Sequence, residues 1–112
     1  MKSFLITFAG MLLLSLSANA QTKTAAKIPE DVEKMLTKYA CLACHKADAK
    51  IIGPAYTEVA KRKYSNEKIV ELIYEPKPAN WPGYPPMAPM KHVPKDDALK
   101  IAKWINSLSA KK

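Results

Sequence analysis

The chain has 112 residues, of which 18 are Lys or Arg and 10 are Asp or Glu, so its formal net charge is +8. This length predicts one domain and excludes a multi-domain enzyme or an array of several stacked repeats. Charged residues at 25% and hydrophobic residues at 48% argue against a disordered or collagen-like chain, and two cysteines are too few for a disulfide-rich miniprotein.

The first twenty residues have the pattern of a secretory signal peptide. Lys2 precedes an apolar run from Phe4 to Leu16, and small residues follow up to Ala20. The run is too short to span a bilayer comfortably. We therefore expect cleavage after Ala20 and an exported protein without stable membrane insertion. Retention of the run as a membrane anchor is the alternative.

Residues 21–28 form a polar lead-in that we expect to be flexible, and the folded domain is expected over residues 29–112. Pro29 suits the first turn of a helix, and the acidic residues that follow it suit the positive end of the helix dipole. Apolar residues then recur at helical spacing. This spacing predicts one buried helix face, formed by Val32, Met35, Leu36 and Tyr39.

Three further helices are predicted after a turn at Gly53-Pro54. They cover residues 55–63, residues 66–74 with Ser65 as N-cap, and residues 96–108. The inward residues are expected to be Ala55, Val59 and Ala60, then Ile69, Leu72 and Ile73, and finally Ala98, Ile101, Ala102, Ile105 and Leu108. The predicted fold class is therefore all-α, with four to five short helices.

The segment between residues 76 and 94 contains seven of the nine prolines. Such density argues against any helix or central strand there, so we predict a long loop. The loop also carries Trp81, Tyr84, Met87 and Met90, and we therefore expect it to pack against an apolar group.

The two cysteines lie in the segment Cys41-Leu42-Ala43-Cys44-His45, which fits four kinds of site. In covalent haem attachment, C-x-x-C-H is the signature, the thiols form thioethers and the histidine ligates the iron. A redox dithiol needs a βαβ pattern that is not evident, and zinc would need His92 as a fourth ligand. A disulfide across so short a loop contributes little stability. The motif and the expected export favour haem attachment.

The Pro-rich loop offers three candidates for a second axial ligand opposite His45, namely Met87, Met90 and His92. A thioether raises the reduction potential relative to a second imidazole. The flanking prolines limit the conformations of the loop and so help to hold a weak ligand in place. We favour Met87, with Met90, His92 or an open sixth position as alternatives.

These features together resemble the small bacterial class I cytochromes c across essentially the whole chain after residue 20. The resemblance rests on the motif at 41–45, Ile-Gly-Pro-Ala-Tyr at 52–56, Pro-Met-Ala-Pro at 86–89 and Ala-Lys-Trp-Ile at 102–105. It implies a cytochrome c fold around one covalently bound haem c. It also implies a one-electron carrier rather than an enzyme.

On the proximal side of the haem, the resemblance assigns Cys41 and Cys44 to the thioether bonds and His45 to the iron. Pro54 matches the proline whose carbonyl accepts a hydrogen bond from the proximal imidazole. Trp104 matches an aromatic residue of the last helix that packs near the first helix.

On the distal side, Met87 matches the methionine ligand because it lies in the sequence Pro-Met-x-Pro. Trp81 matches a tryptophan that donates a hydrogen bond to a haem propionate. The spacing from Trp81 to Met87 is about one residue longer here than in the family.

The predicted function is therefore periplasmic electron transfer by a haem iron that cycles between Fe(II) and Fe(III). The positive charge predicts redox partners with acidic docking surfaces, and the segment 61–63 is a candidate docking site. We expect a monomer that binds no nucleic acid. The alternatives are a cytochrome subunit of a redox enzyme complex, a haem sensor or peroxidase, and a haem-free thiol oxidoreductase.

Overall fold

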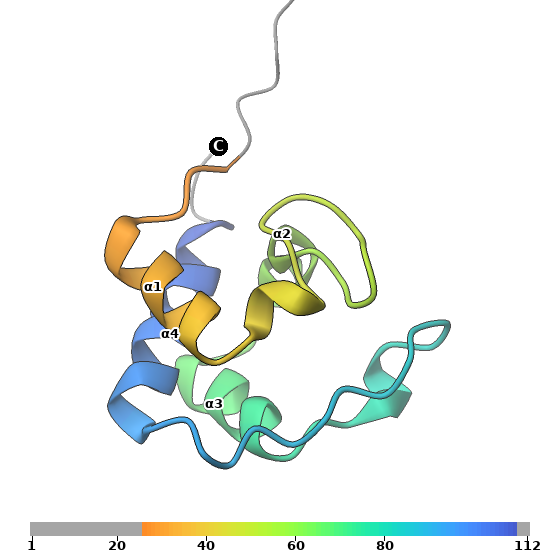
Figure 1. The fold of residues 1–112 in the computed structure, drawn as a ribbon. Coiled ribbons are helices and arrows are strands. Elements are labelled where there is room, and N and C mark those ends of the chain that lie inside the picture. The colour runs from red at the N-terminus through yellow and green to blue at the C-terminus, as the bar shows by residue number, and fades with distance from the viewer. Residues whose placement is uncertain (1–25, 110–112) are drawn as a thin grey trace, which may run out of the picture.

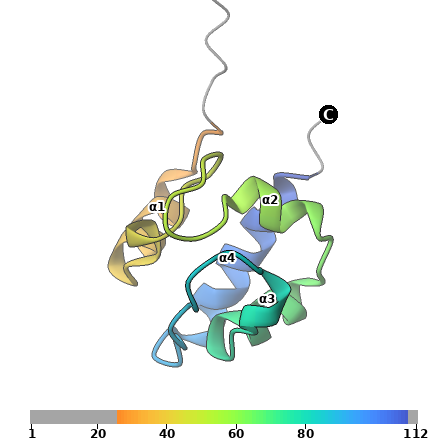
Figure 2. The same ribbon diagram turned by 90° about the vertical axis from the view of Figure 1, so that its right-hand side faces the viewer.

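A computed structural model describes residues 26–109, and these residues form the predicted all-α fold without a strand (Figure 1). Its elements are α1 (Glu30–Lys38), η1 (Cys41–Ala43), α2 (Tyr56–Lys61), α3 (Asn66–Tyr74), η2 (Pro78–Asn80) and α4 (Lys95–Ser107), where η denotes a 3₁₀ helix. Helix α4 packs against α1, α2 and α3, and Figure 2 shows it running behind α2 and α3. The four predicted α-helices are therefore confirmed.

Helix α1 follows the predicted pattern closely. Pro29 is its N-cap, and the first turn is acidic. Val32 and Leu36 are buried, and Tyr39 is buried just after the last helical residue. The hydroxyl of Tyr39 donates a hydrogen bond to Asp97 Oδ2 at 2.5 Å, which ties the end of α1 to α4.

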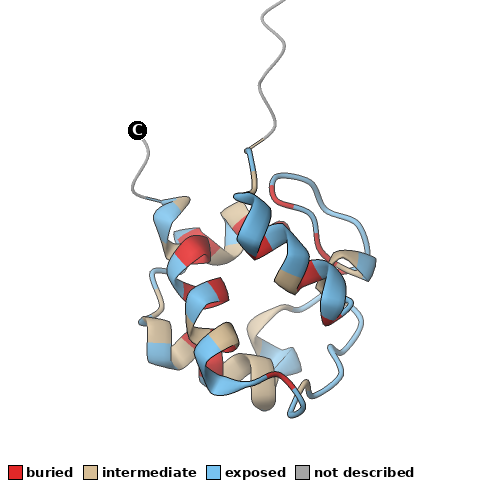
Figure 3. Ribbon diagram, turned by 60° about the vertical axis from the view of Figure 1, so that its left-hand side comes forward, coloured by how far each residue is buried: buried red, intermediate tan, exposed pale blue. Residues whose placement is uncertain are grey.

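The core lies where the four α-helices meet, and Figure 3 marks the buried residues along these helices. On α4, Ala98 and Ala102 are fully buried, so their small side chains let the other helices approach closely. The sequence pattern also placed Leu72 and Ile73 of α3 in the core, but both are only half-buried. Both line a cavity, and Ile73 packs against the core as well.

The Pro-rich segment is a loop as predicted, except that it contains one helical turn, η2. The expectation that proline density would exclude every helix is wrong at this point. Pro78 begins the turn, where its missing N–H would have had no partner in the helix. The end of the loop is anchored to α3, because Met90 N–H donates to the Ile73 carbonyl at 3.0 Å and the Tyr74 hydroxyl donates to the Val93 carbonyl at 2.8 Å.

The predicted signal peptide lies outside the described residues, as does most of the predicted lead-in. Where the structure begins, Ala26 and Ile28 already pack against the core. Within residues 26–109, no helix is long and apolar enough to cross a membrane.

Candidate functional site

A cavity of about 360 Å³ opens between α3, α4, the cysteine motif and the Pro-rich loop. This volume falls in the range of cofactor pockets. All the site residues predicted from the sequence line it, namely Cys41, Cys44, His45, Pro54, Trp81 and Met87. The fold thus brings together residues that are up to 46 positions apart in the chain.

The cysteine motif forms a tight turn in one wall of this cavity. Cys41 begins η1, and its carbonyl accepts hydrogen bonds from the backbone N–H groups of Cys44 at 3.2 Å and His45 at 3.0 Å. Ala40, just before the turn, is left-handed with φ 58°. This geometry places both sulfurs and the imidazole on the same wall. The two cysteines are half-buried free thiols.

His45 is held in the tautomer that suits a metal ligand. Its Nδ1 lies 2.8 Å from the Pro54 carbonyl oxygen, as predicted. Because a carbonyl only accepts, Nδ1 carries the proton and Nε2 keeps a free lone pair. The side chain is 9% exposed, and burial lowers the pKa of His45 although the bond to Pro54 opposes this. A neutral imidazole is therefore favoured near pH 7.

Gly53 is needed for space, a role that the sequence did not reveal. A Cβ atom on this residue would lie 2.7 Å from Cε1 and 2.9 Å from Nδ1 of His45. Its backbone N–H donates to the Cys44 carbonyl at 2.6 Å. The sequence indicated only a turn at Gly53-Pro54, whereas the structure shows that the imidazole lies directly against the glycine.

Tyr56 is a second residue whose role the sequence did not reveal. Its ring is stacked on the His45 imidazole, with centroids 4.9 Å apart and planes at 25°. Trp104 of α4 packs edge-on against Tyr56, with ring centroids 5.2 Å apart. The aromatic contact found for Trp104 is therefore with α2, whereas the resemblance placed this residue near the first helix. Tyr56 lies in the motif at 52–56 and Trp104 in the motif at 102–105. Membership in these motifs is the only sequence signal that could have marked the two residues as functional.

The loop brings two of its three candidate ligands to the cavity. Met87 lines the cavity and is 38% exposed, and it takes no part in the core. Met90 also lines the cavity, but it packs against the core as well. His92 is exposed and does not line the cavity. Its ring lies edge-on to Tyr39 instead, with ring centroids 6.0 Å apart. The structure therefore disfavours His92 as a ligand within this cavity.

Trp81 belongs to a row of four side chains beside the cavity. The guanidinium of Arg62 lies over its ring at 4.1 Å, and the Tyr84 ring meets it edge-on at 5.9 Å. The ammonium of Lys50 lies over Tyr84 at 4.3 Å. The left-handed Gly83, with φ 88°, supplies the bend between the two aromatic residues. Cation–π contacts therefore join the loop to the segments that hold Lys50 and Arg62.

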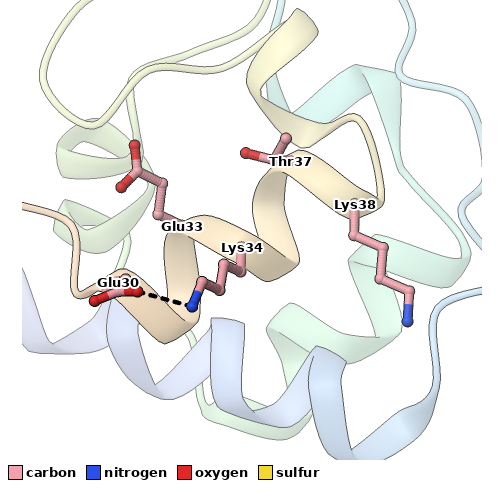
Figure 4. Close-up of a pocket in the computed structure, with 5 residues that line it drawn as sticks. All are labelled: Glu30, Glu33, Lys34, Thr37 and Lys38. Carbon is pink, nitrogen blue, oxygen red and sulfur yellow. Dashed lines mark ion pairs between the residues drawn. The ribbon is translucent and has the colours of Figure 1, made fainter.

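A second, shallow hollow lies on the outer face of α1 (Figure 4). It is lined by Glu30, Glu33, Lys34, Thr37 and Lys38, none of which lines the cavity. An exposed ion pair of 2.7 Å joins Lys34 to Glu30 there. The hollow is the surface of a single amphipathic helix and contains none of the predicted site residues.

The geometry also bears on the other uses of the cysteines. Within the described part of the chain, no group of three or more His, Cys, Asp or Glu side chains is placed to hold a metal ion. His92, which the zinc alternative needs as fourth ligand, does not line the cavity that contains Cys41, Cys44 and His45. Burial raises the pKa of the Cys41 thiol, with a hydrogen bond from Tyr56 opposing it. A thiol that resists ionisation is a poor redox nucleophile.

Comparison with known proteins identifies the family. No family model matches the chain. Cytochrome c-551 of Pseudomonas aeruginosa is 34% identical over 100 residues, covering 85% of this chain and 93% of that protein. The chain belongs to the class I cytochromes c. Cytochrome c-551 of Allochromatium vinosum is 37% identical over 76 residues, covering 63% of this chain and 79% of the relative.

The crystal structure of Nitrosomonas europaea cytochrome c552 has the same fold as this class I cytochrome c. The TM-score is 0.63 at 29% identity, covering 68% of this chain and 98% of the other. The resemblance inferred from the motifs is therefore confirmed. The chain is a haem-based electron carrier rather than an enzyme, and its cofactor is one covalent haem c.

The cavity fits this cofactor. Two free thiols and a neutral imidazole lie on one wall, and apolar side chains of α3, α4 and the loop form much of the rest. The half-buried Leu72 and Ile73, which the sequence pattern assigned to the core, are part of that apolar lining.

Proposed function

We propose that this cytochrome is a periplasmic one-electron carrier whose haem is attached through Cys41 and Cys44 and ligated by His45 and Met87. The observation that carries the proposal is the convergence of these four residues on one largely apolar cavity. When bound, haem c supplies an iron that exchanges single electrons between the Fe(II) and Fe(III) states. Export, and hence the periplasmic location, rests on the signal-peptide pattern of residues 1–20.

The protein's own contribution on the proximal side is orientation. The Pro54 carbonyl holds the Nδ1 proton of His45 and leaves Nε2 available as the ligand atom. A hydrogen bond of this kind also increases the basicity of the imidazole.

On the distal side, Met87 is the better of the two methionines on packing grounds. Met90 packs against the core, and its backbone N–H is bonded to Ile73. A thioether that fills a core position would leave a gap if it turned toward an iron. Met87 has no such packing role, so its sulfur is free to ligate.

Trp81 is proposed to help hold a haem propionate. Its ring lines the cavity, and its indole N–H has no hydrogen bond to a described residue. Arg62 stacks on the same ring and donates to the Asn80 carbonyl at 3.0 Å, which steadies the turn on which Trp81 lies. An indole N–H that borders an anionic group is a suitable donor.

The partner is proposed to be an acidic redox protein that docks at the rim of the cavity. Ile52 and Met87 are large apolar residues that line the cavity and are exposed. Lys50 and Arg62 stack on aromatic lining residues and form no ion pair with a described residue. Arg62 lies in the candidate docking segment 61–63, whereas its neighbour Lys61 is paired with Glu58 at 2.6 Å. An apolar centre with a positive rim favours an acidic partner.

Optical spectra of the holoprotein, produced in a host with haem-attachment machinery, test the ligand assignment. We expect sharp low-spin bands on reduction and a weak far-red band of thioether-to-ferric-iron ligation on oxidation. Met87→Ala should abolish the far-red band, lower the potential and admit external ligands, because the sixth position opens. Met90→Ala is the matched control and should keep the band. Loss of the band in Met90→Ala alone would overturn the assignment.

A further inference from the structure

We propose that Tyr56 is a positioning residue that fixes the plane of the His45 imidazole. The proposal rests on the ligation by His45 proposed above and deepens it. Pro54 fixes the ring at one atom only, and a single hydrogen bond leaves the ring free to tilt about that bond. Tyr56 supplies the missing constraint because its ring covers one face of the imidazole.

The stacking geometry is close enough to restrict rotation. The two ring centroids are 4.9 Å apart with planes at 25°, and both residues are buried. On the imidazole edge, the Gly53 backbone is so near that no Cβ atom would fit. A rotation of the imidazole would therefore drive it into the phenol ring or into the backbone.

Tyr56 can act as a rigid support because it is itself held on three sides. Its backbone N–H donates to the Lys46 carbonyl at 2.9 Å, just after the haem-attachment motif. The next residue, Thr57, donates to the Ala47 carbonyl at 2.9 Å. Trp104 of α4 meets the Tyr56 ring edge-on at 75°, and Tyr56 is only 5% exposed. The orientation of the imidazole is thus linked to the core through α4.

The hydroxyl of Tyr56 is separable from its ring in its effect on Cys41. The Cys41 thiol reaches the Tyr39 carbonyl at 4.0 Å, and a phenol hydroxyl is a donor that a sulfur atom accepts. A thioether has no proton, so after attachment the phenol can donate to the sulfur but the sulfur cannot donate to Tyr39. The ring and the hydroxyl of Tyr56 therefore have different tasks, and different variants test them.

The test uses the cyanide adduct of the ferric holoprotein. Cyanide replaces the distal ligand and is cylindrically symmetrical, so the pattern of paramagnetically shifted haem methyl resonances reports the imidazole plane without any contribution from Met87. We expect Tyr56→Leu to change the order or spread of these shifts. Tyr56→Phe should keep the wild-type pattern, because it retains the ring and loses only the hydroxyl.

Tyr74→Leu is the control, since it removes a tyrosine and its bond to Val93 on the other side of the cavity. It should lower the melting temperature and leave the methyl pattern unchanged. A wild-type pattern in Tyr56→Leu would overturn the proposal. If that variant does not accumulate, Tyr56→Met retains more volume and is read by the same criterion. Wild-type protein without low-spin histidine ligation would instead overturn the proposed function.

Discussion

The cavity wall that carries His45 is buried and braced by α4, whereas the wall that carries Met87 is a loop whose side chains are mostly exposed. On the first, proximal wall, Gly53, Pro54 and Tyr56 all contact the imidazole and all are buried. On the second, distal wall, Trp81 and Tyr84 are held by cations at the surface. Figure 3 shows buried residues mainly along the helices, while the connecting loops are largely exposed.

The two walls differ in burial because their residues are distributed differently along the sequence. Residues 41–56 are close in sequence, so backbone hydrogen bonds between residues a few positions apart assemble the proximal wall. The distal wall spans residues 76–93, and prolines deprive it of backbone donors. Side-chain contacts from distant segments must take their place. We therefore expect a substitution in the proximal wall to change both the unfolding free energy and the iron ligation. A substitution in the distal wall is expected to change one of the two without the other.

The largest contrast is expected between the two tryptophans. Trp104 is 6% exposed and supports Tyr56, so Trp104→Ala should cost about 3–5 kcal/mol of unfolding free energy. Trp81 is only partly buried, and Trp81→Ala should cost clearly less. Denaturant unfolding of both holoproteins measures the difference. Equal losses would show that the distal wall is as firmly packed as the proximal wall.

The two described glycines give a matched comparison of smaller size. Gly53→Ala forces a Cβ into the imidazole, and overpacking of this kind costs about 1–3 kcal/mol. Gly83→Ala meets no atom within 4 Å and pays only for its positive φ, about 1 kcal/mol.

The reduction potential and the low-spin spectrum distinguish these glycine variants better than stability does. Only Gly53→Ala should shift the potential and the spectrum, because only this variant displaces His45, the proposed iron ligand. A shift in Gly83→Ala that equals the shift in Gly53→Ala would contradict the proposed division between the walls.

Removal of the cation from Trp81 should have a small effect on stability. Arg62 is exposed, so Arg62→Ala should cost about 0.5–1 kcal/mol through loss of the stacking on Trp81 and of the hydrogen bond to the Asn80 carbonyl. Arg62→Lys retains the charge but not the planar group, and it should recover only part of the loss. Thermal unfolding of the three proteins tests this order. If Arg62→Lys is as stable as wild type, the positive charge alone accounts for the stabilisation, and the planar guanidinium is not needed.

The smallest structural effect, and the one most specific to function, concerns docking. Lys50→Glu should slow the reaction with an acidic redox protein at low salt, because it reverses a charge at the cavity rim. Lys34→Glu makes the same change in net charge on the outer face of α1 (Figure 4) and should slow the reaction less. Stopped-flow rates at increasing ionic strength measure both variants. Equal effects would show that net charge steers the partner without a preferred face.

Much of the site could be predicted from the sequence because its chemistry lies in short motifs. Cys41, Cys44 and His45 lie within a segment of five residues, and the carbonyl of Pro54 accepts a hydrogen bond from His45 as expected. Gly53 and Tyr56 were part of a recognised motif, but their roles depend on the third dimension. A sequence pattern does not show that an imidazole lies 2.7 Å from the place of a missing Cβ.

The helices, the all-α class and the haem-attachment motif were determined by the sequence alone, since periodicity, capping and covalent chemistry are local properties. Tertiary structure decided which face of α3 lines a cavity, why Met87 rather than His92 lies at that cavity, and what supports the proximal ring. Leu72 and Ile73 illustrate the reason. An apolar face on a helix predicts burial, but it does not say whether protein or cofactor will cover that face.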